Sequence, residues 1–262
     1  MATYGNLCTE FYNADKPSAP PESLAFYLGK ARASGGRVLE PMCGSGRFLL
    51  PMIQAGFQVD GVDASSAMLE SCRASARRLG VHVCVYQQEV ASLQLPEWYS
   101  MVFIPSGSIG LLAEDEELRT GLTRIRSHMQ PNAEFLLEVP ACEQVSSEKV
   151  RLESRTVVCA DGASITYSCT VSKSSWADSV RFTGLYEKRR GGHVIDTEHE
   201  ELILRMYSVE RVVEELTMCG FRSIVVSTVS EKPFLSESGC TLIEARADAG
   251  AYFQRNISSR SS

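Results

Sequence analysis

The chain has 262 residues, of which 44% are hydrophobic and 22% are charged, so it is long enough to bury one sizeable core. Its formal net charge of −6 disfavours binding to nucleic acid, because such binding relies on surfaces rich in Lys and Arg. No segment approaches the roughly 18 uninterrupted apolar residues of a membrane span, and residues 1–6 lack the basic and apolar regions of a signal peptide. We therefore expect a cytoplasmic protein without a membrane partner. Nine cysteines without a CxxC pair suggest free thiols, and neither a zinc site nor a disulfide framework.

Helical and strand patterns alternate strictly from residue 22 to residue 140. The strand patterns are nearly continuous apolar runs, which is typical of a parallel sheet covered by helices on both faces. Glycine or proline stands at several element ends, as at Pro20-Pro21 and Gly80. The predicted elements in chain order are a helix at 22–35, a strand at 38–41, a helix at 48–55, a strand ending at Asp63, a helix at 65–79, strands at 81–88 and 101–104, a helix at 115–129 and a strand at 135–139.

From residue 141 to 205 the pattern changes to an alternation of polar and apolar residues, with turn signals at Asp161-Gly162 and Gly191-Gly192. This alternation predicts an antiparallel β meander. An amphipathic helix follows from Ser208 to Gly220, and strands at 224–229 and 241–245 form a last hairpin that completes a sheet of seven strands. The expected fold class is therefore α/β, a mostly parallel seven-stranded sheet with helices on both faces and an antiparallel β insertion after strand 5. The expected parts are an N-terminal arm at 1–21, a core at 22–140 and 206–247, the meander at 141–205 and a tail at 248–262.

The most informative segment runs from Val38 to Asp63 and contains a strand, a glycine turn, a helix and a second strand that ends in a carboxylate. Gly44 and Gly46 allow the backbone to turn sharply close to a ligand, and the helix that follows offers unpaired N–H groups to an anion. Asp63 lies 19 residues beyond Gly44, where an acid commonly accepts hydrogen bonds from ribose hydroxyls. The segment therefore predicts a site for a nucleoside with an anionic tail.

A dinucleotide fingerprint needs a third glycine, and Leu49 stands at that position, so NAD is disfavoured. The glycine turn and the acid resemble the first two motifs of the class I S-adenosylmethionine-dependent methyltransferases, and residues 22–140 resemble that family throughout. Residues 59–69 (VDGVDASSAML) are close to its second motif, residues 88–90 (QEV) stand where it contacts adenine, and residues 99–108 stand where its fourth strand ends at the methyl donor. The resemblance implies a Rossmann-like fold and S-adenosylmethionine as cofactor, with S-adenosylhomocysteine as product and no metal.

One position departs from the family, which usually has glycine where this chain has Met42, preceded by Pro41; we therefore expect a slightly reshaped turn. The resemblance assigns the cofactor-binding residues by the part of the donor that each contacts. They are Glu40, Cys43, Gly44, Gly46 and Arg47 at the methionine end, Asp63 on the ribose, and Ala64, Met68, Glu89 and Val90 around the adenine.

Methyl transfer is an in-line displacement in which the enzyme supplies alignment and excludes water, so few catalytic side chains are obligatory. Ser106 and Ser108 follow the fourth strand and are candidates for holding the acceptor. Tyr12, together with Tyr4, lies in an arm that the family often folds over the donor, and is a candidate for orienting the sulfonium. The four histidines are expected at solvated positions, and no general base is assigned.

These features predict an enzyme that transfers a methyl group from S-adenosylmethionine to a nitrogen or oxygen of a small-molecule acceptor. The insertion at 141–205 resembles that of small-molecule methyltransferases, including those acting on amino sugars, in which it covers the substrate or forms a homodimer face. The alternatives are a SAM-binding regulator or inactive homologue, which the Pro41-Met42 departure favours, and a nucleic-acid methyltransferase. The last is disfavoured because residues 104–107 (IPSG) are not the polar-Pro-Pro-aromatic motif of enzymes that methylate exocyclic amines. Polyamine synthesis is disfavoured too, because the acids at 114–117 open a helix, where they suit the dipole.

Overall fold

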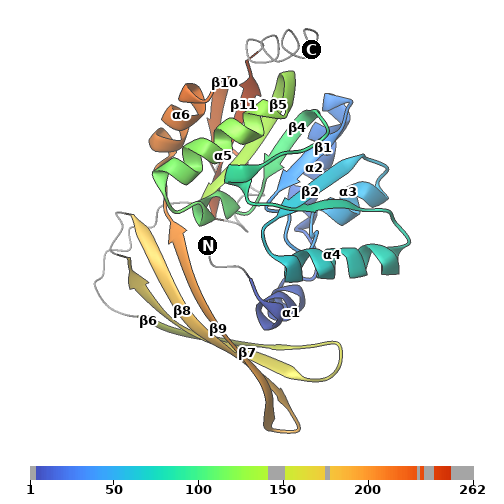
Figure 1. Ribbon diagram of the computed structural model, residues 1–262, viewed down its shortest axis with the longest axis vertical. Coiled ribbons are helices and arrows are strands. Elements are labelled where there is room, and N and C mark those ends of the chain that lie inside the picture. The colour runs from blue at the N-terminus through green and yellow to red at the C-terminus, as the bar shows by residue number, and fades with distance from the viewer. Residues whose placement is uncertain (1–3, 141–150, 175–177, 229–230, 233–238, 249–262) are drawn as a thin grey trace.

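The computed structural model describes residues 4–140, 151–174, 178–228, 231–232 and 239–248. These residues form a seven-stranded sheet with helices on both faces and a separate four-stranded sheet (Figure 1). Within this part of the chain, no helix has the length and apolar character needed to cross a membrane. The eight cysteines described are all free thiols, as expected, and Cys142 lies outside the described residues.

The large sheet has the strand order β10-β11-β5-β4-β1-β2-β3. Strands β3, β2, β1, β4 and β5 are parallel to one another, whereas β11 is antiparallel to both β5 and β10. The chain order reverses between β1 and β4, and the crevice at the carboxyl ends of such strands is where open α/β sheets bind ligands. The strands are β1 Val38–Pro41, β2 Val59–Asp63, β3 Cys84–Gln87, β4 Tyr99–Ile104, β5 Met129–Pro140, β10 Phe221–Ser227 and β11 Cys240–Ala247.

Two buried apolar clusters cover the two faces of this sheet. One includes Leu122 and Leu216 of α5 and α6, and the other includes Tyr27 and Cys72 of α2 and α4. All six residues of β4 are buried, which is the pattern of a strand covered on both faces. The α/β fold class predicted from the sequence is therefore confirmed. The helices are α2 Pro21–Ser34, α3 Leu49–Gln54, α4 Ser66–Leu79, α5 Asp115–Ser127 and α6 Val209–Met218, with short 3-10 turns η1 Val90–Ser92 and η2 Ser108–Leu111.

The second sheet is the antiparallel insertion expected after strand 5. Its strands are β6 Arg151–Val158, β7 Ser164–Lys173, β8 Ser179–Arg190 and β9 His193–Arg205, paired in chain order. The end of β9 is tied to the core because the Tyr207 hydroxyl donates a 2.6 Å hydrogen bond to the Leu112 carbonyl. Strand β6 is an edge strand with Leu152 and Val158 exposed, and a homodimer formed through 141–205 stays a prediction.

The N-terminal arm contains helix α1, Asn6–Asp15, which the sequence patterns did not reveal. An isolated helix of this length is marginal in water, so its contacts must hold it. The helix lies between the core and the four-stranded sheet (Figure 1), and Leu7 and Phe11 pack in one buried cluster with Ile165 and Tyr186. Gly5 supplies no side-chain cap, and the carboxylate of Glu198 on β9 takes that role.

Glu198 accepts hydrogen bonds from the backbone nitrogens of Leu7 and Cys8, at 2.9 and 3.0 Å. These bonds satisfy two of the unpaired donors at the helix start, and the negative charge suits the helix dipole. Lys188 of β8 adds an ion pair to Glu10 at 2.6 Å. These contacts hold the first turns of α1 against strands β8 and β9 of the insertion.

We predict that Glu198→Ala lowers the free energy of unfolding by about 1–2 kcal/mol, the usual cost of losing a helix cap. Hydrogen exchange should rise within residues 6–15, because α1 loses its anchor on β9. Denaturant unfolding with peptide-level exchange measures both effects. His199→Ala, an exposed change on the next residue of β9, is the matched control; equal effects of the two variants would contradict the capping role.

Candidate functional site

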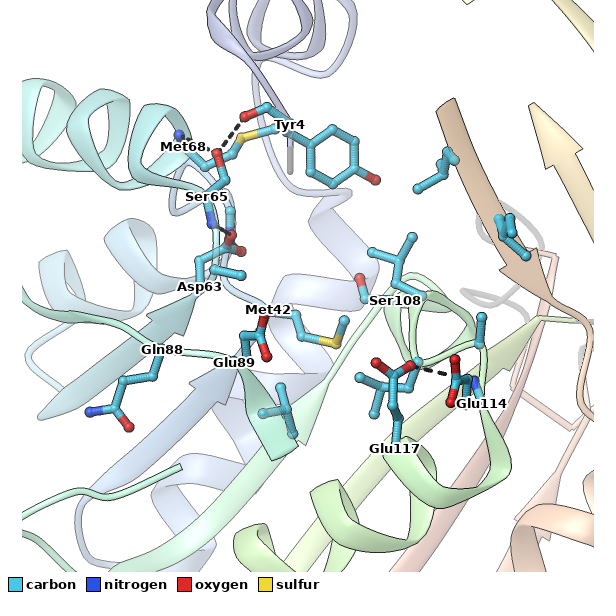
Figure 2. A pocket seen from close by; sticks show the side chains of 18 of the residues that line it. Tyr4, Met42, Asp63, Ser65, Met68, Gln88, Glu89, Ser108, Glu114 and Glu117 are labelled. Atoms are coloured by element: carbon cyan, nitrogen blue, oxygen red, sulfur yellow. Dashed lines mark hydrogen bonds between the residues drawn. The ribbon is translucent and has the colours of Figure 1, made fainter. Parts of the chain in front are cut away.

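A cavity of about 510 Å³ opens at the carboxyl ends of β1 and β2, next to the point where strand order reverses. Its volume lies in the range of roughly 300–1,000 Å³ that small-molecule sites occupy. The core supplies most of the wall, α1 contributes Tyr12, and β9 contributes residues 201–203. Figure 2 shows Asp63, Ser65 and Met68 on one side and Ser108, Glu114 and Glu117 on the other.

The turn after β1 carries Met42 where the family usually has glycine. Met42 has a φ of 59°, in the left-handed region, which costs a residue with a Cβ roughly 1–2 kcal/mol. Its side chain lines the cavity and also packs against the buried cluster beneath α5. The departure therefore reshapes the cavity wall by adding a thioether, while the left-handed turn remains.

The two glycines of this turn have different roles. Gly44 has a φ of 55°, and a Cβ built on it would meet only the Met68 Sδ atom, at 3.8 Å, because it would enter the cavity. Gly46 has a φ of 85°, and a Cβ there would lie 2.7 Å from the Cys72 Sγ atom and 2.9 Å from Leu50. Gly44 thus leaves the cavity wall bare for a ligand, whereas Gly46 allows α4 to pack closely against the turn.

Asp63 ends β2 and joins the two loops at the cavity. Its Oδ2 accepts a hydrogen bond from the Gly44 backbone nitrogen at 2.8 Å, and its Oδ1 accepts one from Ser65 at 2.9 Å. Burial raises the pKa of this carboxyl, and the backbone donors of Ser65, Gly44 and Ala64 oppose that rise. A carboxylate has about four acceptor positions, so these three donors leave one for a ligand hydroxyl.

The residues expected around an adenine also meet at the cavity. Ala64 and Met68 lie after β2, where the Ser65 side chain caps α4 by accepting from the Met68 nitrogen. Glu89 and Val90 lie where β3 gives way to η1, and both line the cavity. Gln88, which sequence reasoning did not assign, also lines it. Its side chain pairs with the backbone of Gln94, at 2.9 Å and 2.7 Å, and so fixes the loop that carries Glu89.

Five of the predicted site residues do not line the cavity. Glu40 is 2% exposed; burial raises the pKa of its carboxyl well above the usual range, and the nearby Arg47 charge opposes this rise. Its Oε2 atom has no hydrogen-bond partner within the described residues. Arg47 donates to the Ser106 hydroxyl at 2.7 Å and lies 5.8 Å from the Tyr12 ring centre. The five are Glu40, Cys43, Gly46, Arg47 and Ser106.

Tyr12 and Tyr4 of the arm close the cavity from the side of α1. Burial raises the pKa of both phenols, so both hydroxyls are protonated at neutral pH. The Tyr4 carbonyl accepts a 2.6 Å hydrogen bond from the Ser65 hydroxyl, which ties the arm to the start of α4 (Figure 2). The arm therefore lies over the same loop that Asp63 organises.

The remaining wall is acidic and was largely missed from the sequence. Ser108 lies there, with its hydroxyl bonded to the Pro105 carbonyl at 3.2 Å, beside Glu114, Glu117 and Glu201. None of the described residues that line the cavity is Lys, Arg or His. Glu201 comes from β9, far from the motifs in sequence, and no local signal marked it.

The histidines do not contribute to this cavity. The expectation that all four are solvated was wrong for His128, which is only 8% exposed and whose Nε2 atom lies 3.4 Å from the Leu93 carbonyl. His128 caps α5 and packs under the loop before β4, so the core surrounds it. No histidine is therefore placed to act as a base here.

One group of possible metal ligands lies away from this cavity. Ligand atoms of Glu10, Cys159 and Asp161 lie within 4.8 Å of one another. Lys188 already pairs with this group, with its Nζ 2.6 Å from Glu10 and 3.3 Å from Asp161. An ammonium thus balances the charge that a metal ion would otherwise balance, and the group acts as an ion-pair network between α1 and the insertion.

Comparison with known proteins agrees with this geometry. Residues 38–132 match the family model described as a methyltransferase domain. A curated relative from Geobacillus sp. (strain WCH70), named as a methyltransferase, is 30% identical over 108 residues, which are 41% of this chain and 44% of the relative. The chain thus matches less than half the length of that relative.

Solved structures extend the likeness over most of the chain. An S-adenosylmethionine-dependent methyltransferase from Clostridium acetobutylicum ATCC 824 has a TM-score of 0.72 at 14% identity, covering 91% of this chain and 96% of that one. An amino pentose methyltransferase from Micromonospora echinaspora, solved with bound SAM, has a TM-score of 0.66 at 17% identity, covering 90% and 94%. At these identities the likeness shows a shared fold. Together with the domain match, it confirms the resemblance to class I methyltransferases.

We predict opposite results for alanine at the two glycines. Gly46→Ala combines a left-handed backbone with an overlap against Cys72, so it should destabilise the protein by about 3 kcal/mol or more. Gly44→Ala should cost only about 1–2 kcal/mol, because its Cβ enters open space. Thermal and denaturant unfolding compare the two; a larger loss for Gly44→Ala would contradict the roles given to them.

Proposed function

We propose that this chain, which contains a methyltransferase domain, binds S-adenosylmethionine in the cavity and transfers the methyl group to a nitrogen or oxygen of a small molecule. The observation that carries the proposal is the joint position of Asp63 and Gly44. A carboxylate with a free acceptor position lies against a bare, left-handed glycine, at the carboxyl ends of two neighbouring parallel strands. That arrangement suits a ribose beside a tightly approached backbone.

The residues present fit the adenine, the ribose and the sulfonium region of this donor. Asp63 would hold a ribose hydroxyl, and Glu89 with the Val90 backbone would hold the adenine beside Met68. Met42 and Gly44 would face the part of the donor next to the sulfonium. Neutral phenols at Tyr4 and Tyr12 present oxygen atoms and ring faces, both of which attract a cation.

When bound, S-adenosylmethionine supplies an electrophilic methyl group on a sulfonium. The acceptor atom forms a bond to this carbon as the carbon–sulfur bond breaks, which leaves S-adenosylhomocysteine and a proton. The chain's own contribution is alignment and exclusion of water, and α1 together with β9 supplies the cover that excludes it. Ser108 is placed on the far wall from Asp63, where its hydroxyl can hold the acceptor (Figure 2).

The charge of the wall favours an amine over an anionic oxygen as acceptor. Glu114, Glu117 and Glu201 gather at the end of the cavity that carries Ser108; Arg181 of β8 pairs with Glu201, and no described lining residue is itself cationic. An ammonium gains from this field, whereas a carboxylate or phosphate is repelled. Glu117 or Glu201 can then take the proton that the amine must lose before attack.

A SAM-binding regulator or inactive homologue remains the main alternative. Met42 is the feature that favours it, since a thioether occupies wall that glycine would leave bare. Donor binding without transfer to any acceptor would support that alternative. Methylation of nucleic acid is disfavoured by the same acidic wall, because phosphates would be repelled.

Calorimetric titration with S-adenosylmethionine and S-adenosylhomocysteine tests the donor site. Asp63→Ala should weaken binding by about 30- to 150-fold, or roughly 2–3 kcal/mol, because a charge-assisted hydrogen bond to the ribose is lost. Glu70→Ala, which removes an exposed carboxylate from α4, is the matched control and should bind as the parent does. No binding by the parent protein would refute the proposed function.

Radiolabelled methyl transfer to a panel of small amines, phenols and carboxylic acids tests the acceptor class. We expect amines to be methylated, and Glu117→Gln to raise their KM about threefold or more, since a partly solvated charge pair is worth up to about 1 kcal/mol. Glu116→Gln removes an exposed charge one residue away and serves as control. Preference for carboxylic acids, or an unchanged KM in Glu117→Gln, would contradict the amine assignment.

A further inference from the structure

A buried carboxylate lies directly behind the acceptor end of the cavity and takes no part in the mechanism above. Glu138, near the carboxyl end of β5, is 2% exposed. Its Oε1 accepts a 2.6 Å hydrogen bond from the Tyr27 hydroxyl, and its Oε2 accepts a 2.9 Å bond from the Ser106 backbone nitrogen. Burying a carboxylate is costly, and two neutral donors offset only part of that cost.

The first of these bonds fixes the carboxylate inside the core. Tyr27 of α2 is fully buried, with its ring 4.7 Å from that of Phe103 and 5.5 Å from that of Phe48. A hydroxyl in such apolar surroundings needs a partner, and Glu138 is that partner. The rings leave Tyr27 little freedom, and its hydroxyl satisfies the Oε1 atom of the carboxylate, while Oε2 is left for the Ser106 backbone.

The second bond reaches the turn between β4 and η2. Ser106 has a φ of 58°, a left-handed conformation that is unfavourable for a residue with a Cβ and so needs support from its surroundings. The next residue, Gly107, is packed so closely that a Cβ would lie 2.8 Å from Pro140. Three residues of the segment that follows, Ser108, Leu111 and Leu112, line the cavity. The position of the turn at Ser106 and Gly107 therefore determines the position of the cavity wall that carries Ser108, the proposed acceptor side.

The same turn also connects to the glycine loop. The Ser106 hydroxyl accepts from Arg47, and the Arg47 guanidinium lies over the Tyr12 ring, which lines the cavity. A continuous chain of contacts thus runs from Tyr27 through Glu138 and Ser106 to Arg47 and the arm.

We propose that Glu138 is a positioning residue for methyl transfer, which holds the Ser106 turn in its left-handed form and so fixes the wall against which the acceptor is aligned. This inference rests on the proposed function. Because Glu138 touches neither the cavity nor the donor-binding loops around Asp63, its loss should affect turnover and spare donor affinity.

Two substitutions at Glu138 separate the hydrogen bond from the charge. In Glu138→Gln the amide oxygen can still accept from Ser106, and the amide nitrogen can donate to the Tyr27 hydroxyl, which is able to accept. Glu138→Leu removes both hydrogen bonds and keeps a side chain of similar volume. Tyr27→Phe removes only the bond on the core side, and serves as the control for a purely structural effect.

The first readout is hydrogen exchange of peptides spanning residues 104–112, in protein without donor. We expect exchange to rise at least tenfold in Glu138→Leu and to stay near the parent level in Glu138→Gln and Tyr27→Phe. The second readout compares S-adenosylhomocysteine affinity and kcat with the amine identified in the acceptor panel. Glu138→Leu should lower kcat tenfold or more with affinity unchanged within twofold, and Glu138→Gln should restore most of the kcat.

Three results would overturn the proposal. Unchanged exchange in Glu138→Leu would show that the carboxylate does not hold the turn. Raised exchange with unchanged kcat would show that the turn does not position the acceptor, and equal kcat losses in Glu138→Leu and Tyr27→Phe would show a merely structural effect. A parent protein that binds no S-adenosylhomocysteine refutes the proposed function instead, and the exchange comparison, which uses no donor, still decides whether Glu138 holds the turn.

Discussion

The Asp63 carboxylate joins the loops that follow two neighbouring parallel strands, and the cavity takes its form from this junction. Gly44 reaches the carboxylate from the turn after β1, and Ser65 reaches it from the start of α4. Ser65 in turn caps α4 and holds the Tyr4 carbonyl of the arm. One buried charge thus organises the glycine turn, the helix start and the cover, and backbone donors offset much of its desolvation cost.

The other side of the cavity depends on contacts between segments that are distant in sequence. Helix α1 belongs to the N-terminal arm, yet Glu198 of β9 caps it and Lys188 of β8 pairs with its Glu10. The insertion and the arm therefore close over the core as one cover, with residues of both facing the cavity (Figure 1). An enzyme that aligns two reactants away from water needs such a cover, which the parallel sheet alone does not provide.

The sequence was most informative where structure is determined locally. Alternating patterns predicted the sheet and the insertion, and Gly44 and Asp63 could be placed because each follows directly on an apolar strand. Strand β5 begins at Met129, six residues earlier than Phe135, because Met129 pairs with Tyr99 of β4 across the sheet. Helix α1 went unseen for the same reason, since its position depends on partners more than 100 residues away in sequence.

The spacing of the motif residues does not reveal which of them line the cavity and which do not. Gly44 and Gly46 are two residues apart and both have positive φ, yet one faces the cavity and the other packs against Cys72. Ser106 and Ser108 follow one strand, yet Ser108 lines the cavity while Ser106 bonds to Arg47. In each pair, two positions that are two residues apart have different surroundings, one at the cavity and one outside its lining.

Two turns at the cavity contain residues with unfavourable backbone conformations. Met42 and Ser106 both adopt left-handed conformations, and they follow β1 and β4, the adjacent strands between which the chain order reverses. Each costs roughly 1–2 kcal/mol, which is a substantial part of the 5–15 kcal/mol by which a typical domain is stable. Left-handed residues also occur elsewhere, as at Asn132 and Asp178, but at the mouth of this crevice both turns carry residues that line the cavity or connect to its wall. The core that buries Glu138 and Tyr27 supplies the rigidity that keeps the Ser106 turn in place, so the stability of the sheet and the geometry of the acceptor wall are set by the same contacts.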